Sequence, residues 1–547
     1  MRAHLIRDIH EWPVYKLSKD RDAFVNEVIN DLERQFDQYG AIELDQALSK
    51  TIFQERQRIK SNPWKVDPPN EGLFFKKLQN EYNENKESES SFQKNKQSVN
   101  RLIHRYTEEI SGSFNIATFH FARKILSWFF HFIYLPVNFN LFRSTKTKIK
   151  RLSEKLIING EIDLVRKLFK DNTIILVPTH SSNMDSIMVG YMSDIFGGLP
   201  AFTYGAGLNL FDSEFFAFFM NRLGAYRVDR RKKNQIYLHT LSTYTRLIAE
   251  RGVNTIFFPG GTRSRSGEVE SKLKLGLLNS VLLAQRNLVE KKSTRKIILV
   301  PVVMTYESVL EARSLMIQHL KLTGQEKFIT KERNSPLREY ISFIWRLMKK
   351  SSKVYLSFAT PLDVFGNIVN EQGKSLNHMG TEIDLKDYFL REGIFIKDGQ
   401  RESIYTKELA SAIVDKYKRF NFILPCHLVA YCAFKTFKKL HPGQDEISLV
   451  QAPEEEFVIP LEDFKSNCLK LISHLNQLKS QGKALISDDL NRNINLVIKD
   501  GVERIGVFHN RKILFIENNQ LLTEDLIGLY FYHNKMINLE NDFSELC

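Results

Sequence analysis

Apolar residues gather in short runs rich in valine, isoleucine and phenylalanine across the middle of the chain, and stretches with helical periodicity separate these runs. Short apolar runs bounded by polar or glycine-rich turns are typical of strands buried inside a sheet. We therefore expect an α/β fold, with a mixed sheet flanked by helices and with ligands bound at the ends of its strands. The expected strands are residues 173–177, 225–228, 254–258, 297–304 and 354–358.

The regions before and after this α/β segment have different patterns. The N-terminal region is polar and mostly helical, and its low-complexity run at residues 83–98 predicts a solvated linker. The C-terminal region mixes helical and apolar stretches and predicts an accessory α+β domain. The expected parts are an N-terminal helical region (1–110), an aromatic and basic segment (111–155), the α/β domain (156–365) and a C-terminal accessory domain (366–547).

The segment 111–155 combines clustered aromatic residues with a run of cations. Residues 119–135 read FHFARKILSWFFHFIYL, and the basic run at 143–155 follows shortly afterwards. The apolar part is shorter than the ~18 to 20 residues of a spanning helix, because His131 interrupts it and Pro136 ends it. The pattern favours an element that lies in the interface of an anionic cytoplasmic leaflet. A core helix with a solvated basic face explains it equally well.

The net charge of +14 implies an anionic partner. Nucleic acid is disfavoured, because the basic residues are not interleaved with aromatics along a recognisable binding module. An acidic carrier protein, a phosphorylated small molecule and an anionic membrane surface remain. The four cysteines show no CxxC spacing, which argues against a disulfide framework and against structural zinc. The first residues lack the apolar core of a secretory signal, so we expect synthesis without export.

A histidine and an aspartate follow the first expected strand. Residues 178–188 read PTHSSNMDSIM, so Asp185 stands five positions after His180, with four residues between them. On one regular helix these side chains would lie roughly 140° apart. They meet only if His180 lies in the loop and Asp185 in the first helical turn, with residues 181–183 capping the helix. The carboxylate would then fix the imidazole tautomer for general-base catalysis. Considered alone, the pattern fits a structural histidine better.

Two downstream segments offer groups that bind anions. The run GAYRVDRRKK (224–233) contains several arginines, and a cation at a strand end suits a phosphate, although a solvated basic face explains such a run more simply. The segment FFPGGTRSRSG (257–267) has consecutive glycines whose N–H groups, together with nearby arginines, suit an anion or an oxyanion. Its spacing is not that of a P-loop. A third segment, VPVVMTYE (300–307), suits a pocket wall or simply the core.

Taken in order, HSSNMD, GAYRVDR, FPGGTRSRSG and VPVVMTYE resemble the four motifs of the glycerolipid acyltransferase family. The large glycerol-3-phosphate acyltransferases are the most similar group, since LYFYHNKMINL (529–539) also resembles their terminal segment. The resemblance implies transfer of a fatty acyl group to the 1-hydroxyl of glycerol 3-phosphate, the first step of phospholipid synthesis. It implies acyl-CoA or acyl-acyl carrier protein as co-substrate, with neither a cofactor nor a metal.

The resemblance also assigns roles to residues. His180 would be the general base and Asp185 its orienting partner. The residues expected to bind substrate are Arg227, Arg230, Gly260, Gly261, Thr262, Arg263, Ser264 and Pro301. Two positions depart from the family pattern, which has an acid where Gly260 stands and an aromatic or aliphatic residue where Arg227 stands.

Several alternatives remain open at this stage. The absence of a GxSxG elbow argues against an α/β-hydrolase, and no HExxH or Cys/His cluster predicts a metal site. Lysophosphatidate or dihydroxyacetone phosphate is an alternative acceptor for the same chemistry, although chain length and the terminal segment favour glycerol 3-phosphate. The missing acid at Gly260 also allows a membrane-bound lipid-binding or scaffold protein that has lost catalysis. The expected location is the cytoplasmic face of a membrane, held as a peripheral or monotopic protein.

Overall fold

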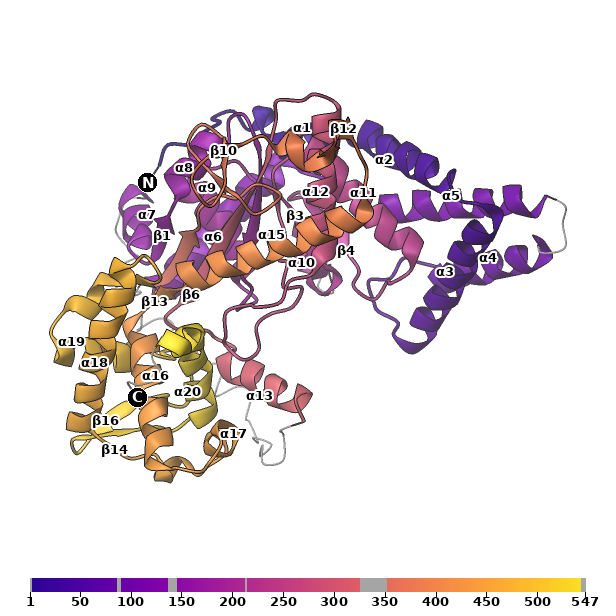
Figure 1. Ribbon diagram of the computed structural model, residues 1–547. Helices are drawn as coiled ribbons and strands as arrows, with labels where there is room; N and C mark the ends of the chain where they lie inside the picture. Colours follow the sequence, from indigo (N-terminus) through magenta and orange to yellow (C-terminus); the bar gives the residue numbers. More distant parts are fainter. Residues whose placement is uncertain (1, 86–89, 136–144, 212–213, 325–351, 543–547) are drawn as a thin grey trace.

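A seven-stranded sheet lies at the centre of the computed structural model, which describes residues 2–85, 90–135, 145–211, 214–324 and 352–542 (Figure 1). Strands β6 and β7 pair antiparallel, and every other neighbouring pair is parallel. This mixed, mostly parallel sheet confirms the predicted fold class. In spatial order the strands are β1 (Leu156–Gly160), β7 (Val354–Phe358), β6 (Ile297–Tyr306), β2 (Thr173–Pro178), β5 (Thr255–Ile256), β3 (Thr203–Gly207) and β4 (Ala225–Val228).

Five of these strands are those expected from the sequence. The bounds of β4 and β7 coincide with the prediction, β2 and β6 run slightly longer, and β5 is shorter. Strands β1 and β3 were not predicted. The first lies at the sheet edge and is only partly buried, and the second, TYGAG, has too few apolar residues to form a recognisable run.

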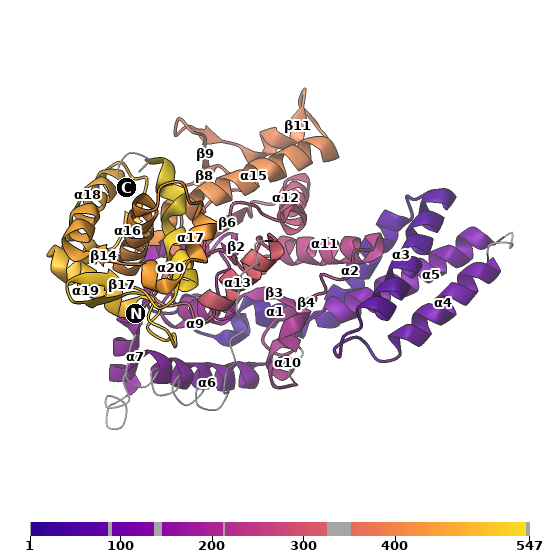
Figure 2. The same cartoon turned by 90° about the horizontal axis from the view of Figure 1, so that it is seen from below.

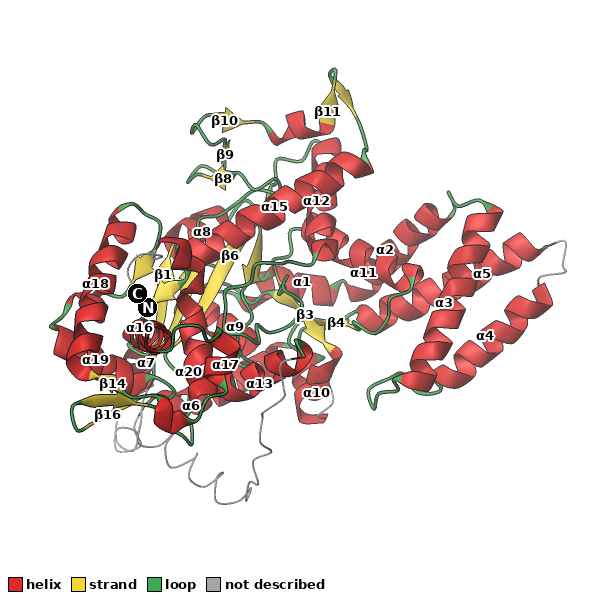
Figure 3. Cartoon of the chain, turned by 60° about the horizontal axis from the view of Figure 1, so that its bottom comes forward, coloured by secondary structure: helices red, strands yellow, loops and turns green. Residues whose placement is uncertain are grey.

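Helices cover both faces of the sheet (Figure 3). Along β2, Ile174 and Leu176 pack into one core, whereas Ile175 and Val177 pack into another, as the alternation of strand side chains requires. Because both faces are buried, the central strands are continuously apolar. Helices on the first face are α6 (Ile116–Tyr134), α8 (Ile162–Leu168) and α9 (Asp185–Ile195), and those on the second are α11 (Gln235–Glu250), α12 (Leu275–Glu290) and α15 (Gly399–Phe420). Helix α13 (Ala312–Leu322) packs on the C-terminal region instead.

The N-terminal helices form an arm that projects away from the sheet (Figure 1). Their apolar stripes share one core with α11. The run at 83–98, predicted as a linker, is largely helical in its described part. That prediction was wrong because the polar residues Asn95 and Ser98 lie on a buried stripe that continues through Val99 and Leu102. The helices of the arm are α2 (Arg21–Phe36), α3 (Ala41–Ser61), α4 (Glu71–Asn85) and α5 (Ser91–Ile110), whereas α1 (Pro13–Lys19) lies beside the sheet, with Val14 in a separate apolar cluster.

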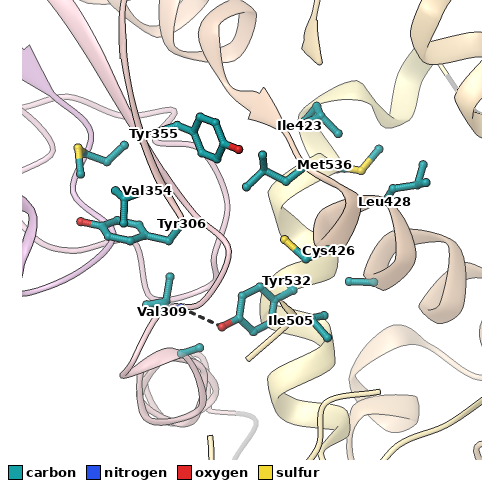
Figure 4. Packing of buried hydrophobic residues seen from close by; sticks show 14 of the residues in the cluster. Tyr306, Val309, Val354, Tyr355, Ile423, Cys426, Leu428, Ile505, Tyr532 and Met536 are labelled. Carbon is teal, nitrogen blue, oxygen red and sulfur yellow. Dashed lines mark hydrogen bonds between the residues drawn. The ribbon is translucent and has the colours of Figure 1, made fainter. Parts of the chain in front are cut away.

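The C-terminal region is built around α16, which is buried along most of its length. Its core is continuous with the first face of the sheet: the hydroxyl of Tyr532 accepts a hydrogen bond from the backbone N–H of Val309 at 2.9 Å (Figure 4). The boundary expected near residue 365 stays a prediction, although α15 beyond it packs on the sheet. The main elements are α16 (Pro425–Leu440), α17 (Glu446–Val450), α18 (Leu461–Ser480), α19 (Ile494–Arg504), α20 (Leu526–His533) and a small sheet of β14 (Ile459–Pro460), β17 (Gln520–Leu522) and β16 (Phe515–Glu517).

Helix α6 carries most of the aromatic stretch singled out in the sequence. Phe130 and Ile133 are buried against the body of the protein, whereas the Phe121 and Trp128 side chains are 55% and 69% exposed. Helix α7 (Thr145–Ser153), from the basic run, lies near the end of α6, and the expected stop at Pro136 falls outside the described residues (Figure 2). Within the described part of the chain, no helix has the length and apolarity needed to cross a membrane.

Candidate active site

The structure brings His180 and Asp185 together at the end of β2. His180 lies in the loop after the strand, and Asp185 is the first residue of α9, as the five-residue spacing required. The imidazole Nδ1 lies 2.9 Å from the Asp185 carboxylate. The carboxylate is fully buried, whereas the His180 side chain is 20% exposed. The pair therefore joins an inner carboxylate to an accessible ring.

Asp185 holds more than the imidazole. Its carboxylate accepts hydrogen bonds from the N–H groups of Ser181 and Ser182 at 2.5 and 2.8 Å, and from the Tyr306 hydroxyl at 2.5 Å. Residues 181–183 were expected to cap α9, but its N-cap is Met184, which makes no side-chain cap bond. The capping prediction was wrong because Asp185 reaches back to the loop instead. Since a carboxylate only accepts, Nδ1 carries the proton and Nε2 remains for a substrate.

The backbone of His180 is also held on both sides. Its N–H donates to Glu270 Oε1 at 2.6 Å, and its carbonyl accepts from the Ser264 N–H at 2.7 Å. The ring centroid lies 4.7 Å from that of Phe258. Both clamping residues come from the glycine-rich segment after β5. This segment therefore sets the position of His180 as well as lining the site.

His180 opens into a cleft of about 1170 Å³. Its walls come from α2, α11, α12 and the segment after β5, so the N-terminal helical region contributes to the site. Among the described residues, the cleft cations Arg230, Arg265 and Lys274 have no ion-pair partner. The residues predicted to bind substrate that line this cleft with His180 are Arg230, Gly261, Thr262 and Arg263. Gly261 has φ +76°, a backbone conformation that favours glycine.

The other predicted substrate-binding residues lie elsewhere. Arg227 donates to the Asn221 side chain at 2.7 Å and packs over the Phe211 ring. Pro301 is buried inside β6, opposite Val177, where the sheet core surrounds it. The Ser264 hydroxyl donates to a backbone carbonyl of its own loop. Gly260 packs behind the cleft against Glu270.

The basic run after β4 is divided between two roles. Arg230 is exposed toward the cleft, whereas Arg231 pairs with Asp67 and Asp229. The fully buried Lys232 ammonium lies 2.6 Å from Glu109 and 3.2 Å from Glu71. The sequence had favoured a solvated basic face for this run, but Arg231 and Lys232 are both ion-paired with acids instead. They fasten the N-terminal arm to the sheet and leave Arg230 for the cleft.

Three residues of the site were missed from the sequence. Tyr306 orients Asp185, Glu270 holds the His180 backbone, and Glu311 accepts from the Asn183 N–H at 2.7 Å. Glu311 also lies 3.4 Å from Arg263. Tyr306 stood within the segment 300–307, and the missing acid at Gly260 was itself a signal to search for another acid nearby. Across the described residues, no three His, Cys, Asp or Glu side chains gather closely enough to hold a metal ion.

Burial perturbs the titration of groups behind the histidine. Burial raises the pKa of Glu270 to about 8, against the hydrogen bond from His180, which lowers it. Burial likewise lowers the pKa of Lys535, in the C-terminal region, to about 8. Burial beside Asp185 raises the pKa of the Tyr306 hydroxyl well above its ordinary value, so it stays a hydrogen-bond donor. The C-terminal region thus reaches the layer directly behind the site.

An apolar cavity of about 190 Å³ meets the cleft beside His180. Ser186, Tyr204 and Phe258 line both spaces. The cavity runs between α6, α9 and the short helix α10 (Glu214–Met220). A charged cleft and an apolar cavity therefore join at the accessible histidine. The apolar side chains around the cavity include Phe119, Ile125, Leu126, Ile187, Phe202, Phe219 and Leu223.

Comparison with known proteins finds similarity in the central α/β region, which contains His180 and Asp185. Residues 159–305 match the family model described as Acyltransferase. Glycerol-3-phosphate acyltransferase of Pseudomonas aeruginosa (strain LESB58) is 28% identical over 260 residues, which are 47% of this chain and 27% of that protein. The protein of the same name from Pseudomonas putida (strain W619) is 26% identical over 445 residues, 78% of this chain and 48% of that one. The matches thus span half or less of these relatives.

Proposed function

We propose that this chain, whose residues 159–305 belong to the acyltransferase family, transfers a fatty acyl group from a thioester donor to the 1-hydroxyl of glycerol 3-phosphate. The observation that carries the proposal is the accessible His180, held by a buried carboxylate at the mouth of a cationic cleft. The names of the distant relatives support this acceptor. The product would be lysophosphatidate, the precursor of membrane phospholipids.

The reaction follows from the free Nε2 of His180. This nitrogen removes the proton of the acceptor hydroxyl as the oxygen attacks the thioester carbonyl. Donors of the cleft stabilise the tetrahedral oxyanion. When the intermediate collapses, the carbon–sulfur bond breaks and the imidazolium returns the proton to the departing thiolate. Asp185 stabilises the transient imidazolium, and no covalent enzyme intermediate is needed.

The two spaces beside His180 suit the two halves of the reaction. Arg230, Arg265 and Lys274 offer cations to the acceptor phosphate, because none of them has an ion-pair partner among the described residues. The apolar cavity beside Phe258 suits the beginning of the fatty acyl chain. At their junction, the thioester carbonyl would lie between the cavity and the histidine.

Purified protein would be tested with labelled glycerol 3-phosphate, lysophosphatidate and dihydroxyacetone phosphate, each offered with acyl-CoA and with acyl-acyl carrier protein. We expect transfer to glycerol 3-phosphate with the highest kcat/KM, and the better donor identifies the carrier. A preference for another acceptor would replace glycerol 3-phosphate in the proposal. Failure with every acceptor would favour a lipid-binding or scaffold role.

In this assay, Arg230→Ala is expected to raise KM for glycerol 3-phosphate by about 10- to 100-fold, since hydrogen bonds to charged groups contribute about 1.5–3 kcal/mol. Its effect on kcat and on KM for the acyl donor should be small. Arg56→Ala, at an exposed position on α3, is the matched control. An Arg230→Ala variant in which only the donor KM rises would place the acyl donor, rather than the acceptor phosphate, beside Arg230.

We also propose that the exposed side of α6 binds an anionic membrane. Trp128 and Phe121 project from it, and the exposed Lys150 and Arg151 lie on the neighbouring α7. Trp128→Asp is expected to weaken binding to vesicles containing anionic lipid by about tenfold or more, because a buried aromatic contributes about 1.5–3 kcal/mol. Leu496→Asp, on α19, is the control. Vesicle sedimentation in which both variants bind like the wild type would contradict the assignment of this surface.

A further inference from the structure

Glu270 is a partly exposed residue whose carboxyl group lies directly behind His180. Its Oε1 accepts the His180 backbone N–H at 2.6 Å. Its Oε2 is buried and has no hydrogen-bond partner among the described residues. The segment that carries Glu270 closes on itself, because the Lys274 N–H donates to the Pro259 carbonyl at 2.7 Å. The acid is therefore fixed in place without contacting the cleft.

Gly260 faces this carboxyl group. A Cβ atom at position 260 would lie 2.3 Å from Glu270 Oε2 and 2.6 Å from its Cδ, closer than real side chains approach. The backbone of Gly260 does not have a positive φ, in contrast to that of Gly261. A side chain at position 260 would therefore force the Glu270 carboxyl group to move, and the constraint is one of space rather than of backbone conformation. The Glu270 carboxyl fills the volume that a side chain at position 260 would enter.

We propose that Glu270 is a positioning residue of the transfer site and supplies, from ten residues farther along the chain, the carboxyl group that is missing at Gly260. This inference rests on the proposed function. It explains how the site keeps an acid behind His180 although the motif carries glycine. Three separate contacts then fix the histidine: Asp185 holds the ring, Glu270 the N–H and Ser264 the carbonyl.

Burial and Asp185 favour a neutral carboxyl group on Glu270, whereas the His180 N–H and Lys535 oppose it. His180 and Asp185 lie on the β2–α9 loop side, Lys535 lies in the C-terminal region, and the Tyr417 hydroxyl of α15 donates to the Val177 carbonyl of β2. Burial raises the pKa of Glu270 to about 8, so at neutral pH it holds a proton. A protonated acid accepts the His180 N–H without placing a second negative charge beside Asp185. Glutamine has the same shape and the same acceptor.

The first test compares Glu270→Ala with Glu270→Gln. We expect Glu270→Ala to lower kcat by about 10- to 100-fold with little change in KM for glycerol 3-phosphate, because displacing a reacting group by about 1 Å costs about 10²-fold. Glu270→Gln should retain most of kcat. In hydrogen–deuterium exchange, the peptide that contains His180 should exchange faster in Glu270→Ala only. Wild-type kcat and exchange in Glu270→Ala would overturn the inference, as would equal losses in both variants.

The second test moves the acid. Gly260→Glu alone should lower activity, because its side chain displaces the Glu270 carboxyl group from the His180 N–H. Combined with Glu270→Ala, it should recover activity above either single variant, because the new glutamate at position 260 can then occupy the space that the Glu270 side chain leaves. A double variant no more active than Glu270→Ala would overturn the exchange of positions. Wild-type protein without any acyl transfer would contradict the proposed function alone, because the hydrogen-exchange comparison still measures the clamp on His180.

The raised pKa of Glu270 makes the stability of the folded protein fall as the pH rises. An acid whose folded pKa is raised keeps its proton in the folded state after the unfolded chain has lost it. The wild-type protein therefore loses stability between about pH 5 and the folded pKa of about 8, whereas Glu270→Gln does not. The melting temperature of Glu270→Gln should rise relative to wild type across this interval and level off above it. A difference in melting temperature between the two proteins that stays constant from pH 5 to 9 would contradict the assignment of a protonated Glu270.

Discussion

Replacing His180 with alanine is expected to lower kcat by about 10²- to 10⁴-fold, the range that general acid–base catalysis contributes. In the proposed mechanism, the imidazole Nε2 is the base, and it lies at the junction of the cleft and the apolar cavity. The loss should appear in kcat with little change in KM for glycerol 3-phosphate, because the phosphate cations are untouched. Initial rates with the best donor, measured on protein whose melting temperature matches wild type, would check this result.

His239 provides the matched control. It lines the same cleft, but its ring packs against Phe36 of the N-terminal region rather than beside a carboxylate. His239→Ala should keep kcat close to that of wild type. Near-normal turnover in His180→Ala would remove the base from the mechanism. Equal losses of kcat in both variants would show that removing any histidine from the cleft disturbs the site. That result would contradict a specific catalytic role for His180.

The His180–Asp185 pair could be predicted from the sequence because its spacing left one geometry open. Five residues place the two side chains on different sides of a helix, so contact required the loop and the first turn. Tyr306 and Glu270 could not be predicted in the same way. They reach this loop from 121 and 90 residues away, through the packing of β6 and of the segment after β5. A local pattern contains no information on such contacts.

In the fold as well, single strands could be predicted from local sequence, whereas their pairing and the burial of polar residues could not. Runs such as VYLSF identify β7 because apolar, β-branched and aromatic residues suit a strand buried on both faces. The antiparallel pairing of β7 with β6 depends on the long connection between them, which no periodicity describes. The polar sequence at the start of α5 predicted a linker rather than a helix, because the buried stripe of this helix includes the polar residues Asn95 and Ser98. Burial of those residues is decided by α3 and by the other helices of the arm.

The basic run after β4 is the clearest case of a local pattern with two outcomes. Arg230, Arg231 and Lys232 are consecutive cations and read as one surface feature. The structure separates them because the arm brings Asp67, Glu71 and Glu109 against this turn. Two of the cations are neutralised by these acids, and one remains for the cleft. The network therefore supports the site as well as the arm.

Replacing Lys232 with methionine is expected to lower the free energy of unfolding of the arm and its attachment by about 3–5 kcal/mol, the cost of removing one partner from a buried ion pair. Methionine fills the aliphatic volume but leaves Glu109 and Glu71 buried without the ammonium. Burial lowers the pKa of Lys232, but the three carboxylates of Glu109, Glu71 and Glu55 outweigh it and raise the pKa overall. The lysine is therefore charged in the folded protein.

Denaturant unfolding, with hydrogen exchange in α5 to locate the weakened region, would measure this loss. Lys233→Met, at the exposed neighbouring position, is the control and should be close to neutral. Adding Glu109→Gln to Lys232→Met should recover part of the stability, because one uncompensated charge is then removed. Since Arg230 lies only two residues before Lys232, Lys232→Met should also raise KM for glycerol 3-phosphate. A Lys232→Met variant as stable as Lys233→Met would show that the arm is held by its apolar core alone.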